Sequence, residues 1–134
     1  MRFHAVDIWL EDDRHLPVGR RPLADMPEWD FGELRLLPAG WINNAFGGWD
    51  RSAELHWPER RLSVGIEASE ELPVCILYSP GEAAPFLCFE PVSHPVNAHN
   101  FPAGDDLLRR LVPGATMHAS CRFAPRQIFD GGRQ

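Results

Sequence analysis

The alternation of apolar and polar side chains is the feature that most limits what this chain can fold into. It holds over residues 61–68 and again over residues 115–123. A period of two places the apolar side chains on one face of a β-strand and the polar side chains on the other. Both segments are therefore predicted to be strands with one buried and one solvated face. Helical spacing is found only over residues 105–111, where three leucines share one face of a short predicted helix.

Shorter apolar segments predict further strands, which span residues 3–10, 33–37, 53–57, 74–79 and 86–90. The last two are continuous apolar runs, as expected for strands that are covered on both faces. Prolines and glycines fall mostly in the connections between the predicted strands. We therefore expect an all-β fold, a β-sandwich, formed as a single domain by residues 1–134 with a frayed tail over residues 125–134.

The composition is that of an ordinary globular domain and argues against two kinds of partner. Apolar residues make up 44% of the chain and charged residues 24%, with a net charge of −6. All 13 basic residues are arginines, and no cluster of them is long enough to follow a phosphate backbone, so we expect no nucleic-acid partner. No apolar run approaches the roughly 20 residues that cross a bilayer, so no membrane partner is expected.

Cysteine usage indicates a reducing compartment. Cys75, Cys88 and Cys121 are odd in number and widely spaced, and each lies inside an apolar segment. They are expected to be reduced core thiols of a cytoplasmic protein. Their spacing also disfavours a zinc site, because no two of them are close enough to form a ligand pair.

The densest group of polar residues begins at the end of the predicted strand 86–90. By alternation, Glu90 ends an apolar row that includes Phe86 and Cys88, and a proline follows it. A carboxylate in such a place loses hydration, which raises its pKa and favours a role as a general base. The alternative interpretation is a solvated glutamate at the end of a strand, since charged residues are mostly exposed.

Two histidines, His94 and His99, lie in the polar loop after this strand. They could act as an acid, as a pair of metal ligands, or as loop residues that hydrogen-bond the backbone. Five residues of separation on a loop with prolines is poor geometry for a metal, and no carboxylate completes a ligand set. We therefore expect no metal site.

A second polar group, residues 41–50, combines two tryptophans with two asparagines. Aromatic rings can cover the C–H faces of a sugar while amides donate to and accept from its hydroxyls, which would make Asn43, Asn44 and Trp49 sugar contacts. The same residues also fit a tight turn, in which Asn and Gly adopt positive φ and the tryptophans fill the core. Both interpretations remain open on these residues alone.

Six short motifs, taken in order, resemble the bacterial members of the aldose 1-epimerase (galactose mutarotase) family. Each motif is weak alone, but together they extend over nearly the whole chain up to Phe123. They are LPVGR (16–20) with WDF (29–31), INNAFGGWD (42–50), ELHWP (54–58), YSP (78–80), CFEPVSH with NAHN (88–100), and LVPG (111–114).

The resemblance implies an all-β super-sandwich that interconverts the α and β anomers of a free aldose, expected here to be a hexose. In the family a base removes the proton of the anomeric hydroxyl while an acid protonates the ring oxygen, and no cofactor is needed. The family's catalytic glutamate falls on Glu90 and its substrate-binding aspartate falls on Asn43, where an amide replaces the carboxylate. An uncharged amide oxygen accepts a weaker hydrogen bond from a sugar hydroxyl. Asn44, Trp49 and His94 are the other expected substrate contacts.

The motifs resemble those of the C-terminal half of the family. Its acid and that acid's partner are histidines that precede the first of these motifs, so His94 or His99 is a hypothesis for the acid here. Half of a two-sheet sandwich leaves apolar surface uncovered, which predicts a homo-oligomer or a complementary N-terminal half as partner.

Two other functions are compatible with the same residues. The main alternative is a non-catalytic carbohydrate-binding or vestigial half-domain, which keeps the fold without the reaction. A glycoside hydrolase would need two opposed carboxylates. Asp50 could be the second, but nothing in the sequence places it across a sugar from Glu90.

Overall fold

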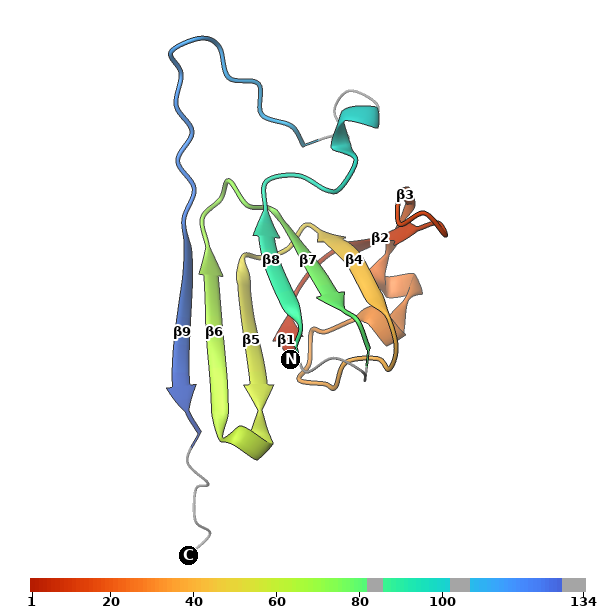
Figure 1. Cartoon of the computed structure of the whole chain (residues 1–134), viewed down its shortest axis with the longest axis vertical. Helices are drawn as coiled ribbons and strands as arrows, with labels where there is room; N and C mark the ends of the chain where they lie inside the picture. Colours follow the sequence, from red (N-terminus) through yellow and green to blue (C-terminus); the bar gives the residue numbers. More distant parts are fainter. Residues whose placement is uncertain (82–85, 102–106, 129–134) are drawn as a thin grey trace, which may run out of the picture.

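Two antiparallel β-sheets pack against each other (Figure 1). The computed structural model describes residues 1–81, 86–101 and 107–128. One sheet has four strands in the order β1(Arg2–Phe3), β5(Ser52–Trp57), β6(Leu62–Ala68) and β9(Cys121–Gln127). The other has five strands in the order β3(Pro17–Pro22), β2(Asp7–Glu11), β4(Ile42–Gly47), β7(Val74–Ser79) and β8(Cys88–Val92). The predicted all-β sandwich is confirmed.

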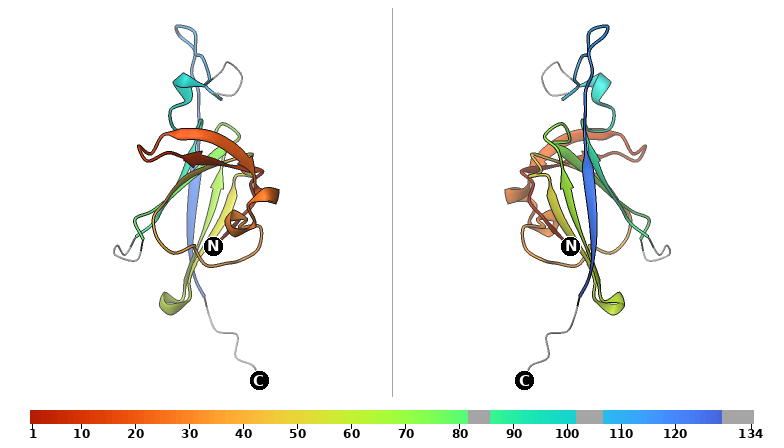
Figure 2. Two further views of the ribbon diagram at one scale, coloured as in Figure 1. Left: turned by 90° about the vertical axis from the view of Figure 1, so that its right-hand side faces the viewer. Right: turned by 90° about the vertical axis from the view of Figure 1, so that its left-hand side faces the viewer.

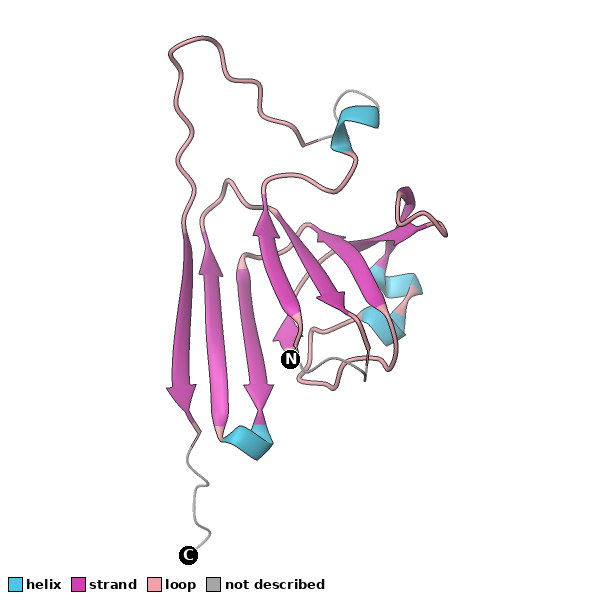
Figure 3. Cartoon of the chain, in the orientation of Figure 1, coloured by secondary structure: helices cyan, strands magenta, loops and turns pink. Residues whose placement is uncertain are grey.

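The described residues contain no α-helix, and the helical turns in Figure 3 are short 3-10 segments. None of the helices in this part of the chain is long and apolar enough to cross a membrane. The four 3-10 segments are η1(Leu23–Asp25), η2(Pro27–Trp29), η3(Pro58–Arg60) and η4(Ala98–Asn100).

Aromatic side chains join the two sheets in the core. Phe46 of β4 is completely buried, and its ring meets the ring of Phe3 edge-on at 5.1 Å between centroids. The ring of Phe31 stacks on the ring of Phe3, with 5.0 Å between centroids. Because β1 belongs to the four-stranded sheet and β4 to the five-stranded sheet, these contacts hold the two layers together.

Strand β7 is covered on both faces, as its continuous apolar sequence predicts. Cys75 and Leu77 point into the core between the sheets and are completely buried. On the outer face, Val74 belongs to a smaller apolar cluster with Trp9 and Phe101. The rings of Trp9 and Phe101 stack in parallel at 4.7 Å between centroids. This second cluster places an apolar floor on the outer face of the five-stranded sheet.

Strand β8 differs from the expectation of cover on both faces. It is the edge strand of its sheet, and its neighbour on one side is β7. Phe89 points into the core, but Glu90 is exposed and Phe86, just before the strand, is 54% exposed. In the described part of the chain, β8 therefore has one covered and one open face.

Two predicted strands were misplaced. Residues 33–37 form an irregular segment rather than a strand. Within it, Arg35 exchanges backbone hydrogen bonds with Met1, which is too short a pairing to form a strand. The guanidinium of Arg35 donates to the carbonyls of Pro27 and Asp30. The strand expected at 115–123 begins only at Cys121 and continues to Gln127. Residues 115–120 form no strand, and Ser120 exchanges hydrogen bonds with Ser69 just past the end of β6. Figure 2 shows the described part of the segment before β9 extending beyond the ends of the sheets.

The predictions for the helix and the tail also need correction. Residues 107–111 are irregular, and the rest of the helix predicted at 105–111 lies outside the described residues. Residues 125–128 were expected to belong to a frayed tail, but residues 125–127 pair with β6 and the amide of Ile128 donates to the carbonyl of Arg61 at 2.8 Å. Residues 129–134 lie outside the described part of the chain.

The three cysteines are unpaired but are not all core thiols. Cys75 is completely buried, and its burial raises the pKa of the thiol well above the usual value. Cys88 is half-buried and Cys121 is exposed. Cys121 is exposed because it begins β9, an edge strand.

Candidate functional site

The outer face of the five-stranded sheet gathers the polar residues that the sequence singled out. Strand register sets Glu90 opposite Ile76, Cys88 opposite Tyr78, and Tyr78 opposite Asn43. Since side chains two residues apart share a face, Glu90, Tyr78 and Asn43 project from the same side of the sheet. Glu90 and Asn43 stand on strands separated by β7, that is, by two strand spacings of about 4.8 Å each.

A carboxylate that was not singled out from the sequence, Glu11, organises one end of this face. Its Oε2 accepts a hydrogen bond from Nδ2 of Asn43 at 2.9 Å. Its Oε1 accepts from Nε1 of Trp41 at 3.3 Å and lies 3.1 Å from Nδ1 of His15. The Glu11 side chain is only 17% exposed. Glu11 thus has a fixed orientation, because donors from a neighbouring strand and its own hairpin hold both oxygens.

Aromatic rings line the face between Glu11 and the edge strand. Trp41 is 50% exposed, and its ring stands perpendicular to that of Tyr78 at 5.1 Å between centroids. Tyr78 in turn lies 6.2 Å from the exposed ring of Phe86. His15 lies 5.0 Å from Trp41 on the other side. Exposed rings beside hydrogen-bonding side chains suit a ligand that has both apolar C–H faces and hydroxyls.

Asp7 and Arg20 occupy the far end of the same face. The carboxylate of Asp7 lies 3.5 Å from Nε of Arg20, whose guanidinium is 5.4 Å from the centre of the Trp9 ring. Gly47 leaves room for the Asp7 carboxylate, which would have to move if a Cβ were present there. Burial raises the pKa of Asp7, and this outweighs the opposing effects of Arg20 and of the Gly47 backbone amide.

The raised pKa of Asp7 predicts how stability depends on pH. A carboxyl group whose pKa is higher in the folded state contributes most to stability below its ordinary pKa, and this contribution is lost as pH rises through the folded-state value. An Asp7→Asn variant is therefore expected to gain stability relative to the native chain as pH rises from below 3.8, the ordinary pKa of an aspartate, to about pH 7. Urea unfolding of both chains at the two ends of this pH range measures the difference, and a native chain that gains on the variant would contradict the assignment.

The structure separates the residues expected to contact a sugar. Asn43 lies on the outer face, as described above. Asn44, one residue further, points the other way, is 9% exposed and donates its Nδ2 to the carbonyl of Trp9 at 2.9 Å. Trp49 is 1% exposed and donates its Nε1 to the carbonyl of Ser52 at 2.9 Å. Asn44 and Trp49 therefore stabilise the fold and do not reach a ligand on this face.

The expected catalytic residues occupy the edge of the face. Glu90 is exposed, so the loss of hydration expected from the sequence is not present in this chain. His94 is half-buried in the loop after β8, where its Nδ1 lies 2.7 Å from Oγ of Ser93. His99 is exposed in η4. In the described part of the chain, no hydrogen bond or ion pair joins Glu90 to either histidine.

Asp50 does not form a carboxylate pair with Glu90. It lies in the connection between β4 and β5, where its Oδ1 accepts a hydrogen bond from the amide of Ser52 at 3.0 Å. Its own amide donates to the carbonyl of His4 at 3.1 Å. Asp50 thus shapes the turn between the two sheets, and the glycoside hydrolase interpretation has no second carboxylate from this residue.

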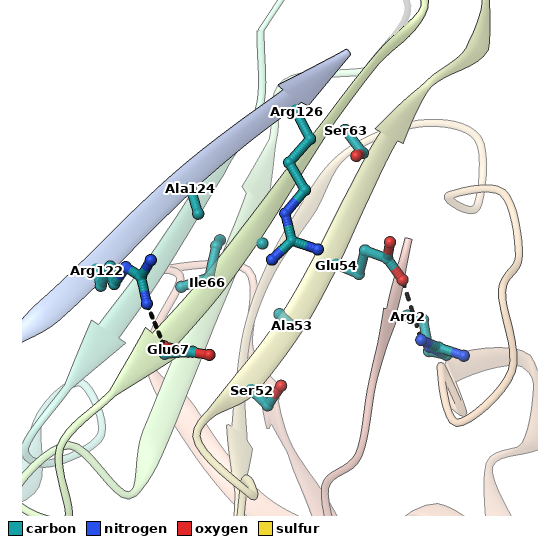
Figure 4. A pocket seen from close by; sticks show the side chains of 11 residues that line it. Arg2, Ser52, Ala53, Glu54, Ser63, Ile66, Glu67, Arg122, Ala124 and Arg126 are labelled. Carbon is teal, nitrogen blue, oxygen red and sulfur yellow. Dashed lines mark hydrogen bonds and ion pairs between the residues drawn. The ribbon is translucent and has the colours of Figure 1, made fainter. Parts of the chain in front are cut away.

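A hollow on the outer face of the four-stranded sheet is a weaker candidate for a site (Figure 4). Small residues, among them Gly65, leave room at its centre. Most of the charges on its rim are already paired: Arg2 with Glu54 at 3.0 Å and Arg122 with Glu67 at 3.4 Å. Such pairs are typical of a solvated sheet face. Across the described residues, no group of three or more potential metal ligands occurs.

Sequence reasoning missed Glu11 and His15 because it did not recognise β4 as a strand. Asparagines and glycines in residues 41–50 are typical of a turn, yet β4 pairs with a strand on each side. Had β4 been assigned, its period of two would have placed Trp41, Asn43 and Ala45 on one face and Asn44 on the other. The alternation of Trp9 and Glu11 in β2 carries the same signal.

Comparisons with known proteins support a shared fold. No family model matches the chain. The Escherichia coli K12 protein named "Uncharacterized protein YphB" is 33% identical over 116 residues, which are 82% of this chain and 39% of that protein. The fold is similar to a crystal structure from Escherichia coli K12 described as a "Putative aldose 1-epimerase", with a TM-score of 0.80 and 26% identity. That match covers 95% of this chain and 45% of the other, so this chain spans less than half the length of the proteins that it matches.

Proposed function

We propose that the outer face of the five-stranded sheet binds a free aldose, a hexose, and interconverts its α and β anomers. The observation that carries this proposal is the placement of Glu90, Asn43 and Tyr78 on one face, beside the carboxylate of Glu11. The similarity of the fold to a structure described as a "Putative aldose 1-epimerase" supports it. The chain would then act as an isomerase.

In the proposed reaction Glu90 removes the proton of the anomeric hydroxyl while an acid protonates the ring oxygen. The bond between C1 and the ring oxygen breaks, which leaves an aldehyde at C1 and a hydroxyl at the former ring oxygen. The C1–C2 bond then rotates, and that hydroxyl attacks the opposite face of C1. Each proton returns on closure, so the reaction is balanced without a cofactor or metal. Exposure on an edge strand leaves Glu90 accessible to a ligand on this face.

The acid is the second part of the proposal. His94 follows Glu90 by four residues and is half-buried, with its Nδ1 next to Oγ of Ser93. This contact orients the ring, and in the tautomer in which Oγ of Ser93 donates to Nδ1, Nε2 carries the proton that an acid donates. We propose His94 as the acid and substrate contact, in preference to His99, whose side chain is exposed in η4.

Polarimetry tests the proposed function. Freshly dissolved α-D-glucose and α-D-galactose should reach their equilibrium rotation faster with the purified chain than in buffer alone. Heat-denatured protein at the same concentration is the control. Equal rates with and without the folded chain would overturn the proposal.

A non-catalytic carbohydrate-binding domain is the second candidate. One observation favours it: in the described residues no acid contacts Glu90, while the Glu11–Asn43–Trp41 contacts alone could hold a sugar. A titration that shows sugar binding, together with polarimetry that shows no acceleration, would select this function.

Uncovered apolar residues lead us to propose self-association as well. Leu36 is 89% exposed and Phe86 54% exposed along an apolar groove that also contains Trp57 and Leu62. A second copy of the chain could bury this groove. Light scattering is expected to give a mass near twice the 15.2 kDa of one chain. A mass of one chain at all concentrations would contradict self-association and favour a complementary N-terminal half as partner.

The three unpaired cysteines fit a reducing compartment. We therefore propose the cytoplasm as the location of the chain.

A further inference from the structure

We propose that Glu11 determines which sugars bind to the outer face of the five-stranded sheet. Its charge favours uncharged aldoses and disfavours sugar phosphates and uronic acids. The inference rests on the proposed sugar site but concerns binding, so it can be tested without turnover. Glu11 lies on β2, far in the sequence from Glu90, and shares its face with Asn43.

Neighbouring donors hold the carboxylate of Glu11 in one position. Both carboxylate oxygens have donors: Nδ2 of Asn43 at 2.9 Å on one, and Nε1 of Trp41 at 3.3 Å on the other, which is also 3.1 Å from His15. The side chain is 17% exposed. These donors hold both carboxylate oxygens in place, and the low exposure reduces screening of the carboxylate charge by solvent.

Glu11 also determines how the side-chain amide of Asn43 is oriented. An ionised carboxylate only accepts hydrogen bonds, so Asn43 must turn its amide nitrogen toward Glu11. The amide oxygen of Asn43 is then directed away from Glu11 as an acceptor. Both residues therefore offer acceptors, which suit sugar hydroxyls, and the pair has one remaining donor, the second N–H of the Asn43 amide.

Acidic side chains outnumber basic ones on the outer face of the five-stranded sheet. Among the described strand residues that project from this face, Asp7, Glu11 and Glu90 are acidic and Arg20 is basic. Arg20 lies 3.5 Å from Asp7, at the far end. Among the residues that the structure describes, neither Glu11 nor Glu90 pairs with an arginine, and the partner of Glu11 is His15, which carries a charge only when it is protonated. An anionic sugar placed between them would be repelled by both carboxylates.

Binding of glucose and glucose 6-phosphate tests the inference, measured by NMR titration of the full chain at 0.15 M salt. We expect the native chain to bind glucose at least about tenfold more tightly than glucose 6-phosphate. Glu11→Gln, which removes the charge, should reduce this ratio at least about threefold, while Glu11→Asp, which keeps the charge, should retain most of it. Glu70→Gln, at an exposed position between β6 and β7, is the matched control and should leave the ratio unchanged.

The outcomes separate this inference from the proposed function. Equal or tighter binding of the phosphate by the native chain would overturn the inference, as would a ratio that Glu11→Gln does not change or a failure to bind either sugar. Selective glucose binding without acceleration in polarimetry would overturn the proposed catalysis and leave the inference standing. The spectrum of each variant without sugar shows whether it is folded, and Glu11→Ser, which also removes the charge, provides the test if Glu11→Gln does not fold.

Discussion

Replacing Phe46 by alanine is expected to lower the free energy of unfolding by about 3–5 kcal/mol, the cost of removing a large aromatic side chain from a packed core. Phe46 is completely buried in the centre of β4, where its ring meets Phe3 at 5.1 Å and Phe31 at 6.1 Å. The surrounding strands pair on both sides of β4, so the cavity cannot close easily. Because domains are stable by only about 5–15 kcal/mol in total, the variant is expected to be close to unfolding.

Urea unfolding followed by tryptophan fluorescence measures this loss. The same substitution at Phe123, which is 54% exposed on the edge strand β9, is the matched control and should cost well under half as much. Equal losses for the two variants would contradict the position of Phe46 at the centre of the core.

Replacing Glu90 by glutamine is expected to reduce the acceleration of mutarotation by a factor of about 10² to 10⁴, the usual contribution of a general base. Glutamine has nearly the same shape but cannot take up a proton. Glu90 is exposed at the open edge of the sheet, so the substitution should not disturb the core. The loss should therefore fall on the rate constant, with sugar affinity changed much less.

Polarimetry at several sugar concentrations separates the two effects. Glu70→Gln, at an exposed position between β6 and β7, is the matched control and should keep the native rate. A Glu90→Gln variant as active as the native chain would show that another group is the base.

The fold class could be predicted from the sequence because the strongest strands are regular. The alternation over residues 61–68 places its apolar side chains on the core side of β6, and the apolar run at 74–79 matches β7, which is buried on both faces. The prediction failed where pairing overrides local preference. β4 contains asparagine and glycine, which favour turns, but hydrogen bonds to β2 and β7 hold it extended.

The candidate site could be predicted only in part, for the same reason. The motif around Glu90 leads to strand β8, where Glu90 lies in the middle rather than at the predicted strand end, and Asn43 lies on the same face. Asn44 and Trp49 were assigned with it because sequence proximity does not show which way a side chain points. Glu11 could not be identified, because its contact with Asn43 joins residues 32 positions apart.

The central claim is that the outer face of the five-stranded sheet binds an aldose, and a ¹H–¹⁵N NMR titration with D-galactose tests it most directly. We predict that D-galactose causes the largest chemical-shift changes at the indole N–H of Trp41, the side-chain amide of Asn43, and the backbone amides of Tyr78 and Glu90. The indole N–H of Trp49, buried in the core, should remain unchanged. Shift changes confined to the four-stranded sheet, or none at saturating sugar, would contradict the account.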